Sequence, residues 1–223
     1  MNLSLFEVLG PVMIGPSSSH TAGAARLGRA ARLIAARPFY KVSFGLHGSF
    51  AKTGKGHGTH EALLAGALGL REDDERLRHA FVLAQQQNIQ WEFGELELSD
   101  VHENTVRIVF FHLDGTRTEV EGSSIGGGRI EITRIDGVTA GLSAEAPTLL
   151  ITQQDVKGVV SEISKTLAEE NINIGIMRVS RVARGRQATT VIETDSPIPE
   201  RVKERLEQVK EILSVRIVDL AQE

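Results

Sequence analysis

The spacing of apolar residues in the last third of the chain predicts an alternating series of strands and helices. Ile172, Ile174 and Ile176 occupy every second position, which is typical of a strand with one buried face. Over 156–171, apolar residues instead recur at helical spacing. Strands are expected at 148–152, 172–176, 188–194 and 213–217, and helices at 156–171 and 199–209. This β-α-β-β-α-β order is that of a ferredoxin-like unit.

The first part of the chain mixes helices and strands without a strict repeat. Ala24, Leu27, Ala31 and Ile34 form an apolar stripe along a helix expected over Thr21–Ala36, with the arginines on its other side. A further helix is expected at 59–68, with Thr59 as its cap, and another from 73 or 74 onward. Strands are expected at 40–46, 89–98, 105–113, 117–121 and 129–135. We therefore expect an α+β fold whose N-terminal domain is a mixed α/β layered structure.

A short segment with a proline separates these two patterns. Leu142–Pro147 is followed by the regular strand and helix series, and glycine is frequent before it and rarer after it. The sequence thus predicts two domains, at 1–142 and 148–223.

Composition is that of an ordinary soluble protein, with 41% hydrophobic and 24% charged residues. The net charge of −4 gives no reason to expect nucleic-acid binding. The sequence has no apolar run near the roughly 18 residues that span a bilayer, and its start lacks the pattern of a secretory signal. We expect a cytoplasmic protein that binds neither membrane nor nucleic acid.

The absence of cysteine and the placement of charge limit which metal centres and ligands this chain can bind. The absence of cysteine excludes a disulfide framework and any cysteine-ligated zinc or iron–sulfur centre within this chain. Residues 1–60 hold seven lysines and arginines but one acidic residue, Glu7. A basic segment of this kind suits a small anionic ligand or an acidic partner, and a solvated basic helix face is the alternative.

The segment Gly15–Thr21 lies just before the first expected helix and is rich in polar groups. It contains four hydroxyl residues, Ser17, Ser18, Ser19 and Thr21, and one imidazole, His20. Unpaired N–H groups at a helix start, together with hydroxyl donors, suit a carboxylate or phosphate. Ordinary helix capping remains the alternative, although one hydroxyl would suffice for it. The imidazole of His20 can act as an acid or base near neutral pH, or serve only in packing.

A second polar cluster is Gly48–His60, which is rich in glycine and is expected to form a loop over Gly54–Gly58. It does not satisfy the phosphate-binding P-loop pattern, because Gly56 follows Lys55 where a serine or threonine is required. Glycines on both sides of His57 leave its imidazole accessible, and a mobile surface loop is the alternative. His57 and His60 could share a metal, but no third ligand is evident, so we expect no metal bound by this chain. Two further polar segments, 102–104 and 123–128, could each be a turn or part of a site.

The C-terminal order of elements, with Asp155 and Gly158 in the turn after its first strand, resembles the ACT domain. The resemblance implies that the domain pairs with a second copy and binds an amino-acid effector at Gln153–Gly158, with Asp155 and Gly158 as effector-binding residues. A purely structural pairing module is the alternative.

Taken in order, the polar segments resemble the β domain of iron–sulfur L-serine dehydratases. The matching stretches are Gly15–Gly23, Gly48–Glu61, His102–Asn104 and Ser124–Gly128, so that with the ACT-like part the resemblance covers essentially the whole chain. The Pro-Ser-Ser-Ser-His-Thr and Thr-Gly-Lys-Gly-His-Gly-Thr runs are specific, and their joint presence is stronger than either alone. The chain departs from the family at Glu103, where proline is frequent, which leaves the role of His102 open.

The resemblance implies a lyase that converts L-serine to pyruvate and ammonia. In this family a [4Fe–4S] cluster is ligated by cysteines of an α portion, so a chain without cysteine implies a separate α subunit. An open iron would act as a Lewis acid on serine. His57 would remove the α-proton, and His20 would position the substrate or assist proton transfer. Ser17, Ser18, Ser19 and Thr21 would hold the carboxylate or support the site, with Thr53 and Lys55 as further substrate-binding candidates.

Two other functions fit the same segments. The N-terminal part also resembles the allosteric substrate-binding domain of some D-3-phosphoglycerate dehydrogenases, which would make the chain a non-catalytic sensor of small anions and amino acids. A free-standing amino-acid-binding protein is the third possibility. Two accessible histidines favour catalysis, because an anion sensor needs arginine, lysine and N–H groups more than imidazole.

Overall fold

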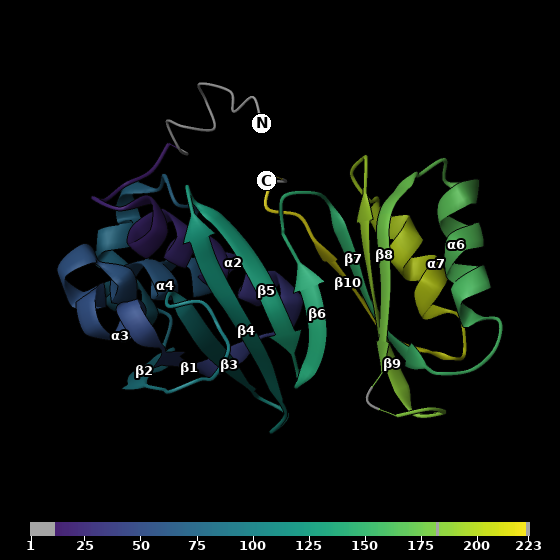
Figure 1. The fold of residues 1–223 in the computed structure, drawn as a ribbon, viewed down its shortest axis with the longest axis horizontal. Coiled ribbons are helices and arrows are strands. Elements are labelled where there is room, and N and C mark those ends of the chain that lie inside the picture. Colours follow the sequence, from purple (N-terminus) through teal and green to yellow (C-terminus); the bar gives the residue numbers. More distant parts are fainter. Residues whose placement is uncertain (1–11, 182, 222–223) are drawn as a thin grey trace. The chain divides into compact units, whose positions relative to one another are not determined.

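The computed structural model describes residues 12–181 and 183–221 and divides the chain into two compact units. The first unit is Met1–Asp136 and the second is Gly137–Glu223 (Figure 1). This division lies a few residues before the segment 142–147, where the two sequence patterns meet. Each unit is α+β, as expected from the sequence.

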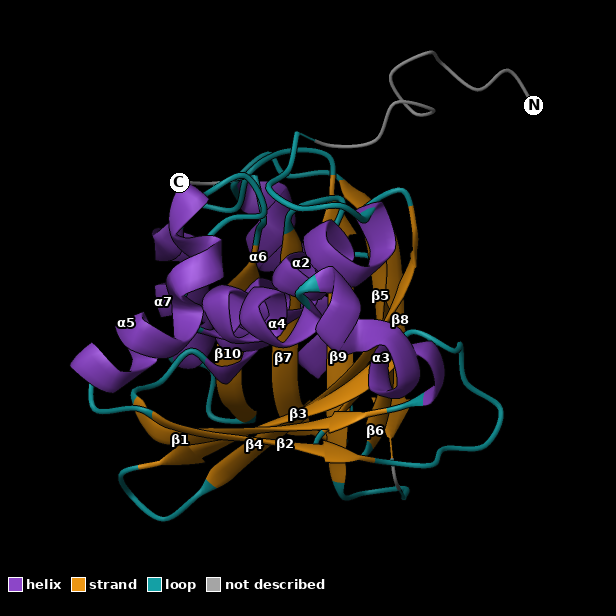
Figure 2. Cartoon of the chain, turned by 90° about the vertical axis from the view of Figure 1, so that its left-hand side faces the viewer, coloured by secondary structure: helices purple, strands orange, loops and turns teal. Residues whose placement is uncertain are grey.

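The first unit packs helices against one face of a mixed sheet (Figure 2). Its strands are β1 (Phe39–Leu46), β2 (Gln90–Glu95), β3 (Thr105–His112), β4 (Arg117–Gly126) and β5 (Arg129–Ile135), in the order β2-β1-β3-β4-β5. The pairs β1–β3, β3–β4 and β4–β5 are antiparallel, and β1–β2 is parallel. Its helices are η1 (Ser18–Gly23), α2 (Ala24–Ala35), α3 (Gly48–Thr53), η2 (Gly54–His57), α4 (Thr59–Ala67), η3 (Glu75–His79) and α5 (Ala80–Gln86).

Helices α2 and α4 pack so closely that only glycine fits at two contact points. A Cβ atom on Gly28 would lie 2.3 Å from the carbonyl oxygen of Leu63, and one on Gly66 would lie 2.0 Å from that of Ala25. The two helices therefore touch through their main chains. His20 lies in η1, which leads directly into α2, and His57 ends η2, with only Gly58 between it and the start of α4. The contact between α2 and α4 therefore brings the two histidines side by side.

Two segments of the first unit differ from the sequence-based expectation. The glycine-rich segment 54–58 was expected to be a loop, but η2, which follows directly on α3, makes it helical up to His57. Glycine is required at its end, where Gly58 has a φ of +68°. Strand β4 continues beyond the expected 117–121 to Gly126, since Ser123 and Ser124 are buried and pair with Glu131 and Ile130 of β5.

The second unit is the expected ferredoxin-like β-α-β-β-α-β structure, preceded by a short strand, β6 (Val138–Leu142), that the sequence did not suggest. Its main elements are β7 (Thr148–Gln154), α6 (Val159–Glu169), β8 (Ile174–Arg181), β9 (Gln187–Thr194), α7 (Glu200–Glu207) and β10 (Ile212–Val218). The sheet order is β10-β7-β9-β8, and its pairs are antiparallel. Both helices cover one face of the sheet, and apolar residues of the two layers form the core (Figure 1).

Candidate active site

The segment before α2 turns sharply and places His20 inside the first unit. Ser17 is extended and caps the turn: its Oγ accepts a hydrogen bond of 3.0 Å from the backbone N–H of His20. The carbonyl of Ser17 also accepts from the amides of Thr21 and Ala22. Ordinary capping thus accounts for one of the four hydroxyl residues in this segment.

The ring of His20 contacts two hydroxyl groups of α3. Its Nε2 lies 3.1 Å from Ser49 Oγ and 3.1 Å from Thr53 Oγ1. Thr53 donates its own proton to the backbone carbonyl of Ser49, at 2.9 Å. Thr53 can therefore only accept from His20, which favours the tautomer with a proton on Nε2. The ring also packs edge-on against Phe50.

His57 lies beside His20, with 5.0 Å between the ring centroids. Its Nδ1 lies 3.0 Å from the carbonyl oxygen of Thr53. A carbonyl only accepts, so Nδ1 carries the proton and, in the neutral ring, Nε2 keeps a lone pair. The main chain therefore fixes the tautomer that a general base needs.

Two threonine hydroxyls brace the segments that carry the histidines. Thr21 Oγ1 donates to the carbonyl of His57, and Thr59 Oγ1 donates to the carbonyl of His20, both at 2.9 Å. Thr21 is 2% exposed and Thr59 is fully buried, so both hydrogen bonds are shielded from water. The braces connect each histidine segment to the one that carries the other histidine.

Partial burial changes the proton affinity of His20. Desolvation is the largest cause that lowers its pKa below the ordinary 6.5, and the nearby charge of His57 lowers it further. A hydrogen bond to the backbone of Ser49 opposes both effects. The lowered pKa makes His20 neutral at neutral pH, when it can accept or pass on a proton.

His60 does not converge with His57, although their spacing suggested a shared metal. Its ring packs on Phe93 with 4.3 Å between centroids, and desolvation lowers its pKa. Across residues 12–181 and 183–221, no group of three histidine, aspartate or glutamate side chains is placed to hold a metal ion.

A cavity of about 300 Å³ adjoins His57. Its walls come from the segment before η1, from η1 and η2, from the first turn of α4 and from η3. The lining residues include Gly15, Pro16, Thr21, His57, Glu61 and Arg78. Sequence reasoning did not single out Glu61 or Arg78, since nothing in the sequence indicated that η3 lies opposite η2.

The other two polar segments reach the same region. Gly48 has a φ of +54°, and a Cβ atom there would lie 2.6 Å from the carbonyl oxygen of Glu103, which also accepts from the amide of Ser49 at 2.8 Å. This contact uses main-chain atoms of Glu103, so it does not depend on the side chain at 103. The ring of His102 accepts from the amide of Asn104 at 3.0 Å through Nδ1.

Ser124 completes the convergence of the four segments. Its Oγ lies 2.1 Å from where a Cβ atom of Gly23 would be, and its amide donates to the carbonyl of Asn104 at 3.0 Å. Ser124 Oγ and Asn104 Oδ1 are buried and have no hydrogen-bond partner within the described residues. The four segments are distant in the sequence and meet around η1.

The remaining candidates from the sequence differ in what they contact. Ser18 and Ser19 are half-buried, and Lys55 is exposed; their side chains make no hydrogen bond or ion pair with other described residues. In the second unit, Asp155 Oδ2 accepts from Arg181 Nη1 and from the amide of Gly185, both at 2.9 Å. The Gly185 bond and then Arg181 lower the pKa of this carboxyl. Gly158, with a φ of +97°, immediately precedes α6.

Searches for similar proteins identify known counterparts for both units. The family model described as "Serine dehydratase beta chain" matches residues 4–90, and that of the ACT domain matches residues 147–211. No helix within the described residues has the length and apolar character needed to cross a membrane.

Two curated relatives match nearly the whole chain. The L-serine dehydratase β chain of Peptoniphilus asaccharolyticus is 38% identical over 218 residues, covering 97% of this chain and 98% of the relative. The probable L-serine dehydratase β chain of Bacillus subtilis is 41% identical over 212 residues, covering 95% and 96%. A D-3-phosphoglycerate dehydrogenase of Bacillus subtilis is 28% identical over 89 residues, which cover 40% of this chain and 17% of the relative.

Proposed function

Because this chain belongs to the serine dehydratase β-chain family, we propose that it supplies the proton-transfer residues for deamination of L-serine to pyruvate and ammonia. The relatives are named β chains, which implies a partner subunit. The catalytic complex would then combine this chain with an α subunit.

His57 is the proposed base that removes the α-proton of serine. The observation that carries the proposal is its fixed tautomer: Nδ1 donates to the carbonyl of Thr53, and the residue lines the cavity. The lone pair on Nε2 could then accept a proton from a bound substrate. His20, 5.0 Å away between centroids, would position the substrate or relay the proton.

The substrate carboxylate is proposed to bind at the start of η1. The hydroxyls of Ser18 and Ser19 are available as donors to a carboxylate, since they make no hydrogen bond within the described residues. Ser17 accepts from His20 and still has its own proton to donate. Thr21 donates its hydrogen bond to the backbone carbonyl of His57, so it would support the site. Thr53 would orient His20, and Lys55 would attract the anionic carboxylate.

The cofactor is proposed to be a [4Fe–4S] cluster held by the α subunit. This chain has no cysteine, so its own residues do not fit as thiolate ligands of a cluster. When bound in the partner, the cluster would supply a Lewis acid for the serine hydroxyl. The residues of this chain would bind and orient serine and move the proton.

The ACT unit is proposed to pair with a second copy and to bind an amino-acid effector at the turn that follows β7. Asp155 is held by Arg181 and Gly185, which would shape this turn for an effector beside Gly158. We further propose that the complex works in the cytoplasm and is not associated with nucleic acid or membrane.

The deciding experiment measures anaerobic pyruvate formation from L-serine with the reconstituted α subunit. The α subunit is assayed alone, with this chain, and with its His57→Ala variant. His79→Ala is a matched control, because His79 is an exposed histidine of η3. Turnover that needs this chain and is abolished only by His57→Ala supports the proposal. Equal activity of the α subunit alone would make this chain a regulatory subunit, and normal turnover with His57→Ala would exclude the base assignment.

A further inference from the structure

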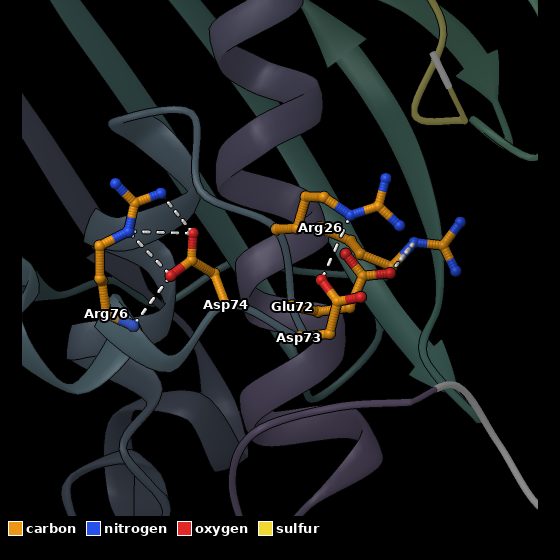
Figure 3. A network of polar contacts seen from close by, with 6 residues as sticks. Arg26, Glu72, Asp73, Asp74 and Arg76 are labelled. Atoms are coloured by element: carbon orange, nitrogen blue, oxygen red, sulfur yellow. Dashed lines mark hydrogen bonds and ion pairs between the residues drawn. The ribbon is translucent and has the colours of Figure 1, made fainter. Parts of the chain in front are cut away.

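One arginine near the candidate site contacts two other segments at once. Arg26 lies in the first turn of α2, six residues after His20. Its Nη1 donates to the carbonyl of Gly128 at 3.1 Å, and its Nε lies 3.9 Å from Glu72 Oε1. Figure 3 shows Arg26 reaching Glu72 beside α2. The two side chains are only 18% and 15% exposed, so water screens this pair weakly.

The first contact restrains the turn between β4 and β5. Gly126, Gly127 and Gly128 have φ values of +95°, +62° and +78°, and consecutive glycines have no side chains that could hold the turn by packing. The hydrogen bond from Arg26 anchors its last residue to a buried helix. The same turn begins two residues after Ser124, which packs on Gly23.

The second contact leads to the wall of the cavity. Glu72 faces Arg26 through its carboxylate, and its backbone carbonyl accepts from the amide of Ile14 at 2.9 Å. Ile14 begins the segment that lines the cavity next to His57. Arg26 therefore contacts this wall of the cavity indirectly, through Glu72.

Neighbouring ion pairs hold the segment around Glu72 in place. Arg71 Nε lies 3.2 Å from Asp73 Oδ1, and Arg76 Nη2 lies 2.6 Å from Asp74 Oδ2. Asp74 also caps η3, which carries Arg78 of the cavity lining; Figure 3 shows Asp74 facing Arg76. These local ion pairs favour one conformation of the segment, and the Arg26–Glu72 pair connects that segment to α2.

We propose that Arg26 is a positioning residue of the candidate active site. It holds the glycine turn and the Ile14 wall in register with α2, the helix that follows the His20 turn. It touches no reacting group and acts through Gly128 and Glu72. This inference rests on the proposed function, since it assigns a role around that same site.

Arginine is suited to this role for a geometric reason. Its planar guanidinium presents several N–H groups in fixed directions, so it can face the Gly128 carbonyl and the Glu72 carboxylate at once. The Nε atom is buried without a hydrogen bond to any described residue and depends on Glu72 for compensation of its charge. A lysine at this position keeps the positive charge but offers one point of contact. A glutamine loses the charge and cannot reach both partners at once.

The test uses Arg26→Gln and Arg26→Lys, with Arg32→Gln as the matched control. Arg32 lies at the other end of α2, where it donates to the carbonyl of Arg37 and lies over the ring of Phe39. Amide hydrogen exchange is measured at Ile14 and over 126–129 in this chain. The kcat and KM for L-serine are measured in the complex with the α subunit.

For Arg26→Gln we expect faster exchange in both regions and a loss of about 10- to 100-fold in kcat, because small displacements of positioning groups are costly. Arg26→Lys should restore part of the kcat, and Arg32→Gln should change neither readout. Unchanged exchange at either region, a normal kcat, or an equal loss in Arg32→Gln would overturn the inference. Arg26→Lys alone decides the matter if Arg26→Gln does not fold: exchange and kcat equal to those of the unaltered chain would then refute it.

Failure of this inference can be distinguished from failure of the proposed function. If His57→Ala keeps full turnover while Arg26→Gln shows both effects, the base assignment is wrong and the positioning role stands. If His57→Ala abolishes turnover while Arg26→Gln behaves as the unaltered chain, only the positioning role is wrong.

Discussion

The hydroxyl of Thr21 donates a hydrogen bond of 2.9 Å to the backbone carbonyl of His57, although 36 residues separate them in the sequence. This bond fixes the main chain at His57 from the helix that follows His20. The matching bond from Thr59 to His20 makes the connection reciprocal. The relative placement of the two imidazoles thus rests on two threonine hydroxyls.

Thr21→Val should therefore weaken the restraint on the main chain at His57. The substitution keeps the shape but leaves a shielded carbonyl without a donor, which costs about 1–3 kcal/mol of unfolding free energy. We expect a lower urea midpoint and a reduced kcat in the complex. Thr21→Ser retains the hydroxyl and is the control; stability equal to that of the unaltered chain in Thr21→Val would show that the bond contributes nothing.

Stability should depend on pH through His20. Because burial holds the pKa of folded His20 below its ordinary 6.5, the unfolded chain binds the proton more readily. The contribution of His20 is therefore fully present above pH 6.5 and is lost as the pH falls from 6.5 through the lowered pKa. Urea unfolding at a series of pH values should show a smaller decrease on acidification for His20→Gln than for the unaltered chain. An identical pH profile for the two would contradict the lowered pKa.

The contact between α2 and α4 should not tolerate a methyl group. Gly66→Ala would place a Cβ atom 2.0 Å from the carbonyl oxygen of Ala25, so the helices must separate. Overpacking of this kind costs about 1–3 kcal/mol or more. Thermal unfolding should show a clear loss for Gly66→Ala. Gly94→Ala is the control, since no atom lies within 4 Å of its added Cβ; similar losses in both variants would argue against the close helix contact.

Ser49→Ala tests whether His20 needs its hydroxyl partners. The variant removes one of the two hydroxyls within 3.1 Å of His20 Nε2 and leaves Thr53 in place. We expect kcat to decrease about tenfold, because the ring of His20 is oriented less well. The free energy of unfolding should decrease by only about 1 kcal/mol, the net contribution of one hydrogen bond. Steady-state kinetics of the complex provide the measurement. A wild-type kcat would mean that Thr53 alone orients the ring.

Sequence patterns predicted the parts of this structure that depend on local periodicity. The order of strands and helices in the ferredoxin-like unit was predicted correctly, but the strand expected at 172–176 runs from Ile174 to Arg181 in the structure, and Ile176 is 38% exposed. The segment 54–58 was predicted wrongly, because glycine usually indicates a loop, whereas here it permits close packing against Thr59.

The geometry of the candidate site could not be predicted in the same way. The run around His20 and the run around His57 were both visible in the sequence, but their contact depends on the packing of α2 on α4. The hydroxyls of Ser49 and Thr59 looked like ordinary loop and cap residues, and only tertiary structure brings them to His20. The roles of these residues in catalysis remain predictions for the variants described above.

The glycine contact between α2 and α4 has a consequence for protein engineering. Because main-chain atoms meet at Gly28 and Gly66, the spacing of the two histidines is set by the thickness of two polypeptide backbones. Substitution of apolar side chains elsewhere in the core would change the stability of the protein but not the spacing of the two histidines. Directed evolution of a new substrate preference should therefore succeed in the cavity lining, such as Glu61 and Arg78, and fail at this pair of glycines.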